Sequence, residues 1–286
     1  MIHALQENGR ASIQELAELL HAPRDYVSQR LRLLVERDGL RVVAALDPGF
    51  VGHHVLVHAM VSTTGPAREV ATRIAEVDDA VFVSLVSGSH PLVFESRHGN
   101  DEQLHAMLDH VRRIPTVRQV QVTTYGEVLR GFFVADSRRE IALDDLDHRL
   151  IAALQIDGRA SYRELAEAVH LSPSSVRSRV RRLIEAGLIR ISAIPSGGVS
   201  RNRVAVGVGI ILGDDAEPVR RYLVDSPAID FAARSHGSYD FVATIGGSSA
   251  VDVLEVIEQL RALPPVSGLE SWTHLDVVKE DYAGSR

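Results

Sequence analysis

Arginine and serine side chains gather on one short segment of an otherwise acidic chain. From Ser172 to Arg190 the sequence "SPSSVRSRVRRLIEAGLIR" holds five arginines and one glutamate, a local charge of +4 on a chain whose net charge is −7. Guanidinium groups suit phosphate oxygens and the O6/N7 edge of guanine. Short hydroxyls can reach base edges or phosphates. Nucleic-acid binding is therefore one of two interpretations of this segment, and a solvated basic face is the other.

An apolar stripe assigns these side chains to one face of a helix. Its members recur at i, i+4, i+7 and i+8 and would form the buried side: Val176, Val180, Leu183 and Ile184. The residues predicted to contact DNA are Ser172, Ser174, Ser175, Arg177, Ser178, Arg181 and Arg182. A basic run on an ordinary helix is commonly a solvated face, so the neighbouring elements decide between the two interpretations.

Two shorter helices are expected before this one, over about 144–155 and about 162–169. Gly158 is predicted to stop the first, and Ser161 with Glu164 forms a capping box for the second. Ser172 caps the third helix, and Pro173 takes its first position, where the missing N–H costs nothing. This pattern is typical of a helix-turn-helix unit, whose last helix enters the major groove by its N-terminal end.

A second copy of the unit stands at the front of the chain. Residues 2–21 and 151–170 are identical at 13 of 20 positions, at an offset of 149. The offset persists downstream, where Gly88-Ser89 corresponds to Gly237-Ser238. The whole chain is therefore interpreted as a tandem duplication.

The front copy has a weaker basic face. Its third helix keeps an apolar stripe formed by Val27, Leu31, Leu34 and Val35. Residues 22–41 hold five arginines and three acids, a local charge of +2, and Pro23-Arg24 replaces the Ser-Pro start. The DNA contacts predicted for this copy are Arg24, Ser28 and Arg32. The front copy therefore keeps the apolar pattern that predicts the fold, but fewer of the side chains that predict DNA contacts.

Strand and helix patterns follow each helical unit in the order βαββαβ, the ferredoxin-like arrangement. The predicted fold class is α+β, with two copies of a winged or three-helix helix-turn-helix domain, each followed by a βαββαβ domain. The helix-turn-helix domains are expected at residues 1–45 and 143–192, the ferredoxin-like domains at 50–128 and 200–282, and a linker at 129–142.

Composition limits the other classes of protein. Cysteine is absent, which excludes disulfides, thiolate metal sites and cysteine nucleophiles. No apolar run approaches a membrane span, and the N-terminus lacks a basic segment followed by an apolar one. No Ser/His/Asp arrangement, Walker loop or dinucleotide glycine pattern is found. We therefore expect a cytoplasmic protein that is not an enzyme and has no cofactor, no metal site and no membrane partner.

The segment "LDDLDHRLIAALQIDGRASYRELAEAVHLSPSSVRSRVRRLIEAGLI" (Leu143–Ile189), followed by "GSYD" (Gly237–Asp240), resembles the Lrp/AsnC family of bacterial and archaeal transcription regulators. The resemblance covers nearly the whole chain, twice. It implies a DNA-binding regulator whose βαββαβ domains pair and sense an amino acid or a related small molecule. It also implies an internal pseudo-dimer within one chain, and further assembly into homo-oligomers.

The resemblance places effector binding at the turn before the third strand of the sensing domain, which maps onto Gly237, Tyr239 and Asp240. A carboxylate there could hold an α-ammonium group through a charge-assisted hydrogen bond. Asp240 could equally serve only to brace the hairpin. The first half keeps the turn glycine, Gly88, and loses the tyrosine and the aspartate, which puts effector binding by that half in doubt.

Two other classes of function stay open. The fold also resembles that of siroheme decarboxylases, which occur as paired or fused halves and need basic and histidine groups around a tetrapyrrole. In "GHHVLVH" (Gly52–His58) the histidines are more simply interpreted as strand residues with satisfied hydrogen bonds. A sensor or partner protein that has lost specific DNA binding is the third class. The arginines and serines kept in the second copy argue against it.

Overall fold

The computed structural model describes residues 1–282 apart from residues 38, 132–140 and 195–202. Most of the predicted linker at 129–142 lies outside the described residues, as do the first residues of the domain predicted at 200–282. The chain forms two compact units, each built from both halves of the sequence. One unit comprises Met1–Val51, Phe132–Ser196 and Tyr282–Arg286, and the other comprises Gly52–Gly131 and Gly197–Asp281.

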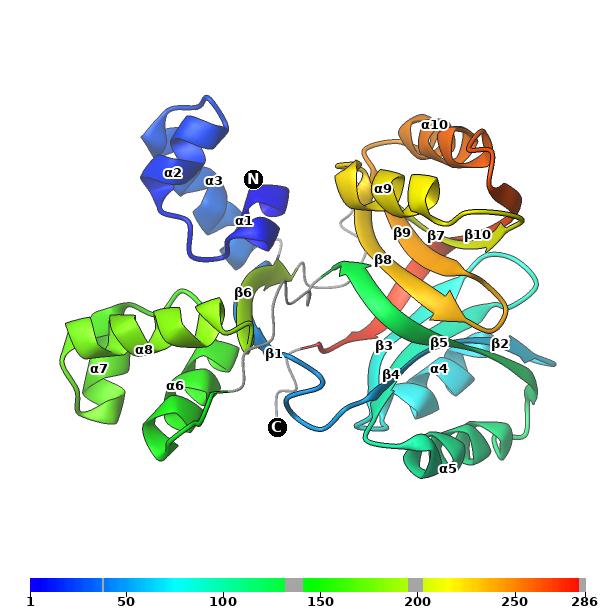
Figure 1. Ribbon diagram of the computed structural model, residues 1–286, viewed down its shortest axis with the longest axis horizontal. Helices are drawn as coiled ribbons and strands as arrows, with labels where there is room; N and C mark the ends of the chain where they lie inside the picture. The colour runs from blue at the N-terminus through cyan, green and yellow to red at the C-terminus, as the bar shows by residue number, and fades with distance from the viewer. Residues whose placement is uncertain (38, 132–140, 195–202, 283–286) are drawn as a thin grey trace. The chain divides into compact units, whose positions relative to one another are not determined.

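The first unit contains both helix-turn-helix copies (Figure 1). The front copy consists of α1 (Ile2–Glu7), α2 (Ile13–Leu19), α3 (Arg24–Glu36) and β1 (Arg41–Leu46). The second consists of α6 (Asp145–Ile156), α7 (Tyr162–Val169), α8 (Pro173–Glu185) and β6 (Ile189–Ile194). The predicted capping box of Ser161 and Glu164 is confirmed, and Ser12 with Glu15 repeats it in the front copy.

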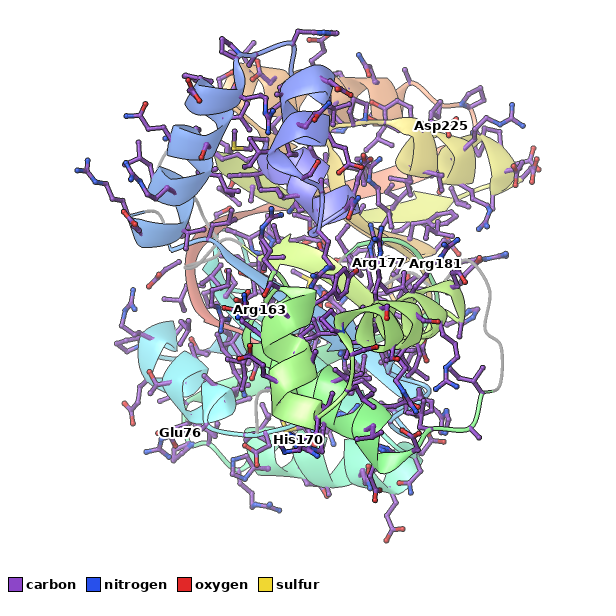
Figure 2. All side chains as sticks on the ribbon, turned by 90° about the vertical axis from the view of Figure 1, so that its left-hand side faces the viewer. Glu76, Arg163, His170, Arg177, Arg181 and Asp225 are labelled. Atoms are coloured by element: carbon purple, nitrogen blue, oxygen red, sulfur yellow. The ribbon has the colours of Figure 1, made fainter. Side chains whose placement is uncertain are left out.

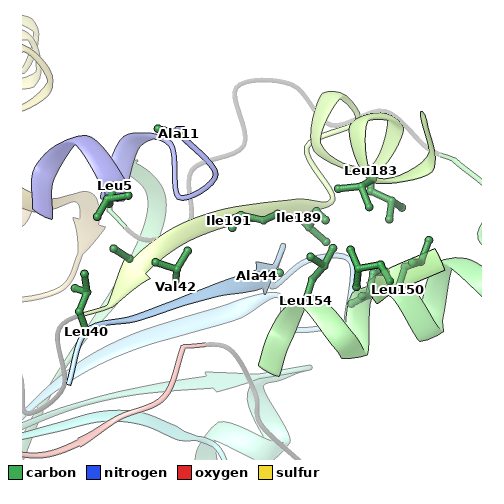
Figure 3. Packing of buried hydrophobic residues seen from close by; sticks show 14 of the residues in the cluster. Leu5, Ala11, Leu40, Val42, Ala44, Leu150, Leu154, Leu183, Ile189 and Ile191 are labelled. Carbon is green, nitrogen blue, oxygen red and sulfur yellow. The ribbon is translucent and has the colours of Figure 1, made fainter. Parts of the chain in front are cut away.

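The two copies share one hydrophobic core. Its buried side chains come from both copies and pack around strands β1 and β6, which pair antiparallel. Figure 3 shows Leu5, Val42, Leu154 and Leu183 among them. Val35 and Ile184, predicted to be buried, are wrong assignments, since they are 47% and 41% exposed. Both lie near the C-terminal end of their helix, one position past the last buried leucine.

The glycine predicted as a helix stop has a different physical role. Helix α6 does end just before Gly158, but this residue is not among those with a positive φ. A Cβ atom there would lie 2.7 Å from Ile191 Cγ2 and 3.0 Å from the Val42 carbonyl oxygen. Gly9 meets the mirrored contact, with a Cβ 2.7 Å from the Ile191 carbonyl oxygen. Both glycines allow close backbone approach to the β1–β6 pair.

The second unit contains both βαββαβ repeats, which confirms the predicted α+β fold class. The first repeat is β2 (Val55–Thr63), α4 (Ala67–Ala75), β3 (Ala80–Val86), β4 (Leu92–His98), α5 (Asp101–Arg112) and β5 (Val117–Arg130). The second is β7 (Val204–Leu212), α9 (Glu217–Asp225), β8 (Ile229–His236), β9 (Phe241–Gly247), α10 (Ala250–Arg261) and β10 (Val266–Glu280). Strands β8 and β9 form a hairpin around Gly237-Ser238.

The two repeats close into one barrel with the strand order β10-β3-β4-β2-β5-β8-β9-β7. Two ladders join the repeats, β5 with β8 and β10 with β3, so the internal pair is made by main-chain hydrogen bonds as well as by side chains. Among the described residues, every helix falls short of the length and hydrophobicity needed to cross a bilayer.

Candidate nucleic-acid interface

The N-terminal end of α8 carries a cluster of serine hydroxyls. Ser172 caps the helix, its Oγ accepting a hydrogen bond from the Ser175 N–H at 3.2 Å. The same oxygen lies 2.9 Å from Ser174 Oγ and 2.8 Å from Ser175 Oγ. These serines are exposed, and Pro173 occupies the first helical turn as predicted. Hydroxyls and N–H groups at an exposed helix N-terminus offer donors to phosphate oxygens or base edges.

A buried carboxylate fixes the opposite side of the helix. Asp147 on α6 has a fully buried side chain, and Arg179 Nη1 donates to its Oδ1 at 2.9 Å. Arg179 also binds Asp144 Oδ2 at 2.8 Å, and Arg182 forms a further ion pair with Asp147. The pKa of Asp144 lies below its usual range, first because the Asp147 N–H donates to it and then because Arg179 does. These contacts hold α8 against α6 on the side of α8 that faces the domain.

Sequence reasoning missed this anchor. The residues "LDDLD" (Leu143–Asp147) did contain a signal, because an acid that falls on the apolar side of an amphipathic helix needs a partner when it is buried. Arg182, predicted to contact DNA, is turned to Asp147, although 47% of its side chain stays exposed. Its contact with DNA stays a prediction.

The outward cations of α8 are Arg177 and Arg181, which Figure 2 labels. Arg177 makes no ion pair with any residue that the structure describes, and its guanidinium lies 5.9 Å from the centre of the Tyr162 ring. Arg181 Nε pairs with Glu185 Oε1 at 2.6 Å across one helical turn, with 76% of its side chain exposed. Exposed pairs of this kind contribute little to stability, so Arg181 can exchange its carboxylate for a phosphate at small cost.

The front copy presents a different surface. Helix α3 begins after Pro23, which provides no side-chain cap. Arg24, Ser28 and Arg32 are exposed, and neither arginine forms an ion pair among the described residues. Helix α1 aligns with the last six residues of α6, Ile151–Ile156, at the offset of 149.

The predicted effector residues have structural partners in the second unit. The Tyr239 hydroxyl donates to Glu270 Oε2 at 2.6 Å, and burial, followed by Glu270, raises the pKa of this phenol. Asp240 Oδ2 accepts the Leu212 N–H at 2.7 Å, a contact that fits a bracing role, while its carboxylate remains exposed. Gly237 has φ +127°, and a Cβ atom there would lie 2.9 Å from the Val122 carbonyl oxygen. Effector binding by Gly237, Tyr239 and Asp240 stays a prediction.

The barrel interior holds a histidine that differs from expectation. His58 on β2 is 4% exposed, and its ring centre lies 5.4 Å from that of Trp272 and 6.3 Å from that of Tyr125. Neither of its ring nitrogens has a hydrogen-bond partner among the described residues, so the interpretation of a satisfied strand histidine is wrong for this residue. Burial lowers the pKa of His58 to about 3 and that of His274 to about 4.

Comparisons with known proteins agree with the helical part of this picture. A model of the AsnC-type helix-turn-helix domain matches residues 143–184, and one of winged helix-turn-helix DNA-binding domains matches residues 1–38. The HTH-type transcriptional regulator FL11 of Pyrococcus furiosus is 26% identical over 140 residues, covering 48% of this chain and 93% of that protein. The FL11 protein of Pyrococcus abyssi is 27% identical over 143 residues, 49% of this chain and 94% of that protein.

The tandem arrangement is similar to that of a solved enzyme. The crystal structure of the siroheme decarboxylase NirDL matches 98% of this chain and 91% of its own, with a TM-score of 0.64 and 16% sequence identity. At that identity the likeness shows the fold alone. The chain therefore carries AsnC-type and winged helix-turn-helix domains within a tandem fold like that of NirDL. Among the described residues, no group of three or more His, Asp or Glu side chains could hold a metal ion.

Proposed function

We propose that this chain is a sequence-specific regulator of transcription that binds double-stranded DNA. The observation that carries the proposal is that one side of α8 is anchored to the domain while the other side is exposed. Its rear arginines, Arg179 and Arg182, are held by Asp147, while its serine-rich end and Arg177 face solvent. A recognition helix needs both properties, because base readout requires a helix held in a fixed register and a polar face that remains available.

The charge distribution supports local rather than global attraction to DNA. The chain carries 38 acids against 31 Lys and Arg, so its overall field does not favour a polyanion. Affinity must then come from a small number of contacts to phosphate, and these release few counterions. We expect a moderate salt slope that depends strongly on single arginines of α8.

The regulator is proposed to respond to a small molecule of the amino-acid class. The support is the exposed Asp240 carboxylate beside the tightly packed Gly237 turn, a pairing that suits an α-ammonium group next to exposed backbone. The corresponding turn of the first half has Gly88 with open space around it and no aspartate. Effector binding is therefore assigned to the second half.

The test is a titration of the full chain on the DNA upstream of its own gene, over a range of salt, with and without a pool of amino acids. Arg181→Ala should weaken binding to every sequence and flatten the salt slope by about one unit. Arg73→Ala is the matched control, because Arg73 also pairs with a glutamate one turn away on an exposed helix face, but on α4. Equal effects of the two variants would contradict the proposal, and no binding by the wild type would end it.

An enzyme on the same fold is the second candidate, favoured by the whole-chain likeness to NirDL. Its barrel histidines, His58 and His274, are neutral near pH 7, so they would not supply positive charge to the carboxylates of a tetrapyrrole. A spectroscopic titration with an iron uroporphyrin separates the two candidates. Tight binding with a shifted absorption band, together with no DNA binding, would favour the enzyme.

A further inference from the structure

We propose that the DNA site of this chain is composite, with two unlike half-sites in one fixed arrangement, rather than a palindrome. The inference rests on the proposed function, and it adds what kind of DNA the chain recognises. Two features of the first unit carry it. The helix-turn-helix copies form one body, and their recognition helices present different chemistry at equivalent positions.

Reciprocal arginine contacts lock the two copies together. Arg10 Nη1 donates to the Gly158 carbonyl oxygen at 2.6 Å, and its Nη2 donates to that of Ala160 at 2.9 Å. Arg159, which is 149 residues further along the chain, donates in return to the Gly9 carbonyl oxygen at 2.6 Å. Arg10 also lies over the Tyr162 ring, 4.5 Å from its centre. Each copy therefore holds the main chain of the other.

Main-chain pairing and the shared core extend this lock. The β1–β6 ladder pairs Arg41 with Ile194 and Leu46 with Ile189, and Val43 with Ser192 at its middle. Val43 and Ser192 are themselves equivalent at the offset of 149, so a pseudo-twofold axis passes through this pair. The Gly9 N–H donates to the Ile191 carbonyl oxygen at 3.0 Å, and the Gly158 N–H to that of Val42 at 2.7 Å, in the same symmetry. With one core for both copies, α3 and α8 cannot move independently.

The symmetry ends at the outer faces of the two helices. At the offset of 149, Arg177 of α8 corresponds to Ser28 of α3, and Ser178 corresponds to Gln29. All four side chains are exposed. An arginine reads the O6/N7 edge of guanine, whereas a glutamine reads the N6/N7 edge of adenine. We infer a half-site with a guanine opposite Arg177 and a half-site with an adenine opposite Gln29.

A symmetric pair of identical helices reads a palindrome, because each half-site meets the same side chains. In this chain the two joined copies hold α3 and α8 in pseudo-twofold positions, and the two helices present different side chains. The two half-sites are then unlike in sequence and fixed in spacing, and the complex has a defined direction on the duplex.

The experiment is a randomised-site selection with the full chain, followed by sequencing of the bound DNA. The wild type should yield a directional consensus whose halves do not match by inversion. The double variant Ser28→Arg with Gln29→Ser gives α3 the side chains of α8 at these positions and should shift the consensus toward a palindrome. Arg73→Ala serves as the control variant whose consensus should not change.

Inserting half a helical turn, about five base pairs, between the half-sites should abolish joint binding, because the two joined copies fix their separation. A palindromic wild-type consensus would overturn the inference and leave the proposed function intact. An unchanged consensus for the double variant would also overturn it. No enriched sequence at all would instead count against DNA recognition itself.

Discussion

The first and second halves of this chain have the same architecture, but they have diverged unevenly. Where the halves meet, equivalent residues make equivalent contacts: Gly9 mirrors Gly158, and Arg10 mirrors Arg159. Where they face outward, equivalent residues differ, as Pro23 and Ser172 do at the start of the recognition helices. Symmetry has persisted where a change in one half would break a contact in the other.

The barrel interior shows a third pattern, in which the halves differ but complement each other. The counterpart of His58 in the second half is Gly207, and the ring of Trp272 fills the space that a side chain at Gly207 would need. Trp272 then stacks against His58. A duplicated chain can thus make its core asymmetric, which an assembly of two identical chains cannot do at a symmetric interface.

Removing the anchor of the second recognition helix should give the largest effect. Asp147→Asn leaves Arg179 and Arg182 without their buried carboxylate, and we expect a loss of about 3 to 4 kcal/mol in the free energy of unfolding. That is the lower part of the range for broken buried ion pairs, because both arginines still reach solvent. Chemical denaturation at constant pH measures it.

Asp145→Asn is the matched control for this anchor. Asp145 is exposed in the first turn of the same helix, so its loss should cost only the small interaction of a carboxylate with the helix dipole, a few tenths of a kcal/mol. Equal losses for the two variants would show that Asp147 acts through the helix end and not through its arginines.

Local patterns predicted the elements of this fold well, since capping boxes, apolar stripes and turn residues act within a few positions. Ser161 with Glu164 and Ser172 with Pro173 begin their helices where the sequence placed them. The apolar stripe by itself does not show where the core ends along the helix. Ile184 continues the helical spacing, but it lies beyond the end of the core, a fact that depends on what packs against α8.

Contacts between residues far apart in sequence could not be predicted. The reciprocal contacts of Arg10 and Arg159 join residues that are 148 to 150 positions apart, and no sequence period predicts which carbonyl oxygens an arginine will reach. The lack of hydrogen-bond partners for His58 likewise depends on the closed barrel, which places Trp272 of the other half against its ring. The exposed serines and arginines of α8 followed from the helix pattern, whereas the role of Asp147 required knowing that it is buried.

The asymmetric barrel interior should appear in the acid stability of the protein. Burial lowers the pKa of His58 to about 3, so between pH 6.5 and pH 4 the unfolded chain binds a proton that the folded chain does not. The free energy of unfolding linked to His58 is at its full value above pH 6.5 and falls as the pH is lowered. For His58 alone the loss by pH 4 is about 3 kcal/mol. His58→Phe keeps a ring against Trp272 and should remove this part of the acid slope, measured by denaturation at several pH values.

The control for His58 is His54→Gln, at an exposed position just before the same strand. His274 retains its own proton-linked loss, because burial lowers its pKa as well, so a reduced slope rather than a flat one is expected. Identical slopes for the wild type and His58→Phe would contradict the buried, neutral state of this histidine. DNA binding near pH 7 should be the same in both proteins.

The symmetric seam predicts matched costs in the two halves. Gly158→Ala and Gly9→Ala each place a Cβ 2.7 Å from an atom of Ile191, and each should cost about 2 kcal/mol, as overpacking of a well-packed site does. Gly65→Ala is the comparison, because its Cβ would lie 3.6 Å from Thr116 Cγ2, an ordinary contact. Thermal unfolding of the three variants measures the costs. A loss confined to one of the two seam glycines would show that the halves do not meet symmetrically.

The smallest effects are expected at the start of α8, where one variant of Ser172 removes the helix cap and another keeps the cap but adds a charge. Ser172→Ala removes the helix cap and should cost about 1 kcal/mol, whereas Pro23→Ser adds a cap to α3 and should gain less, up to about 0.5 kcal/mol, because the unfolded chain also gains freedom. Ser172→Asp keeps the cap but places a negative charge at the helix end that is proposed to meet DNA. It should therefore unfold like the wild type and bind DNA more weakly. If Ser172→Asp binds DNA as well as the wild type does, the N-terminal end of α8 faces away from the duplex, and Ser172 is a cap alone.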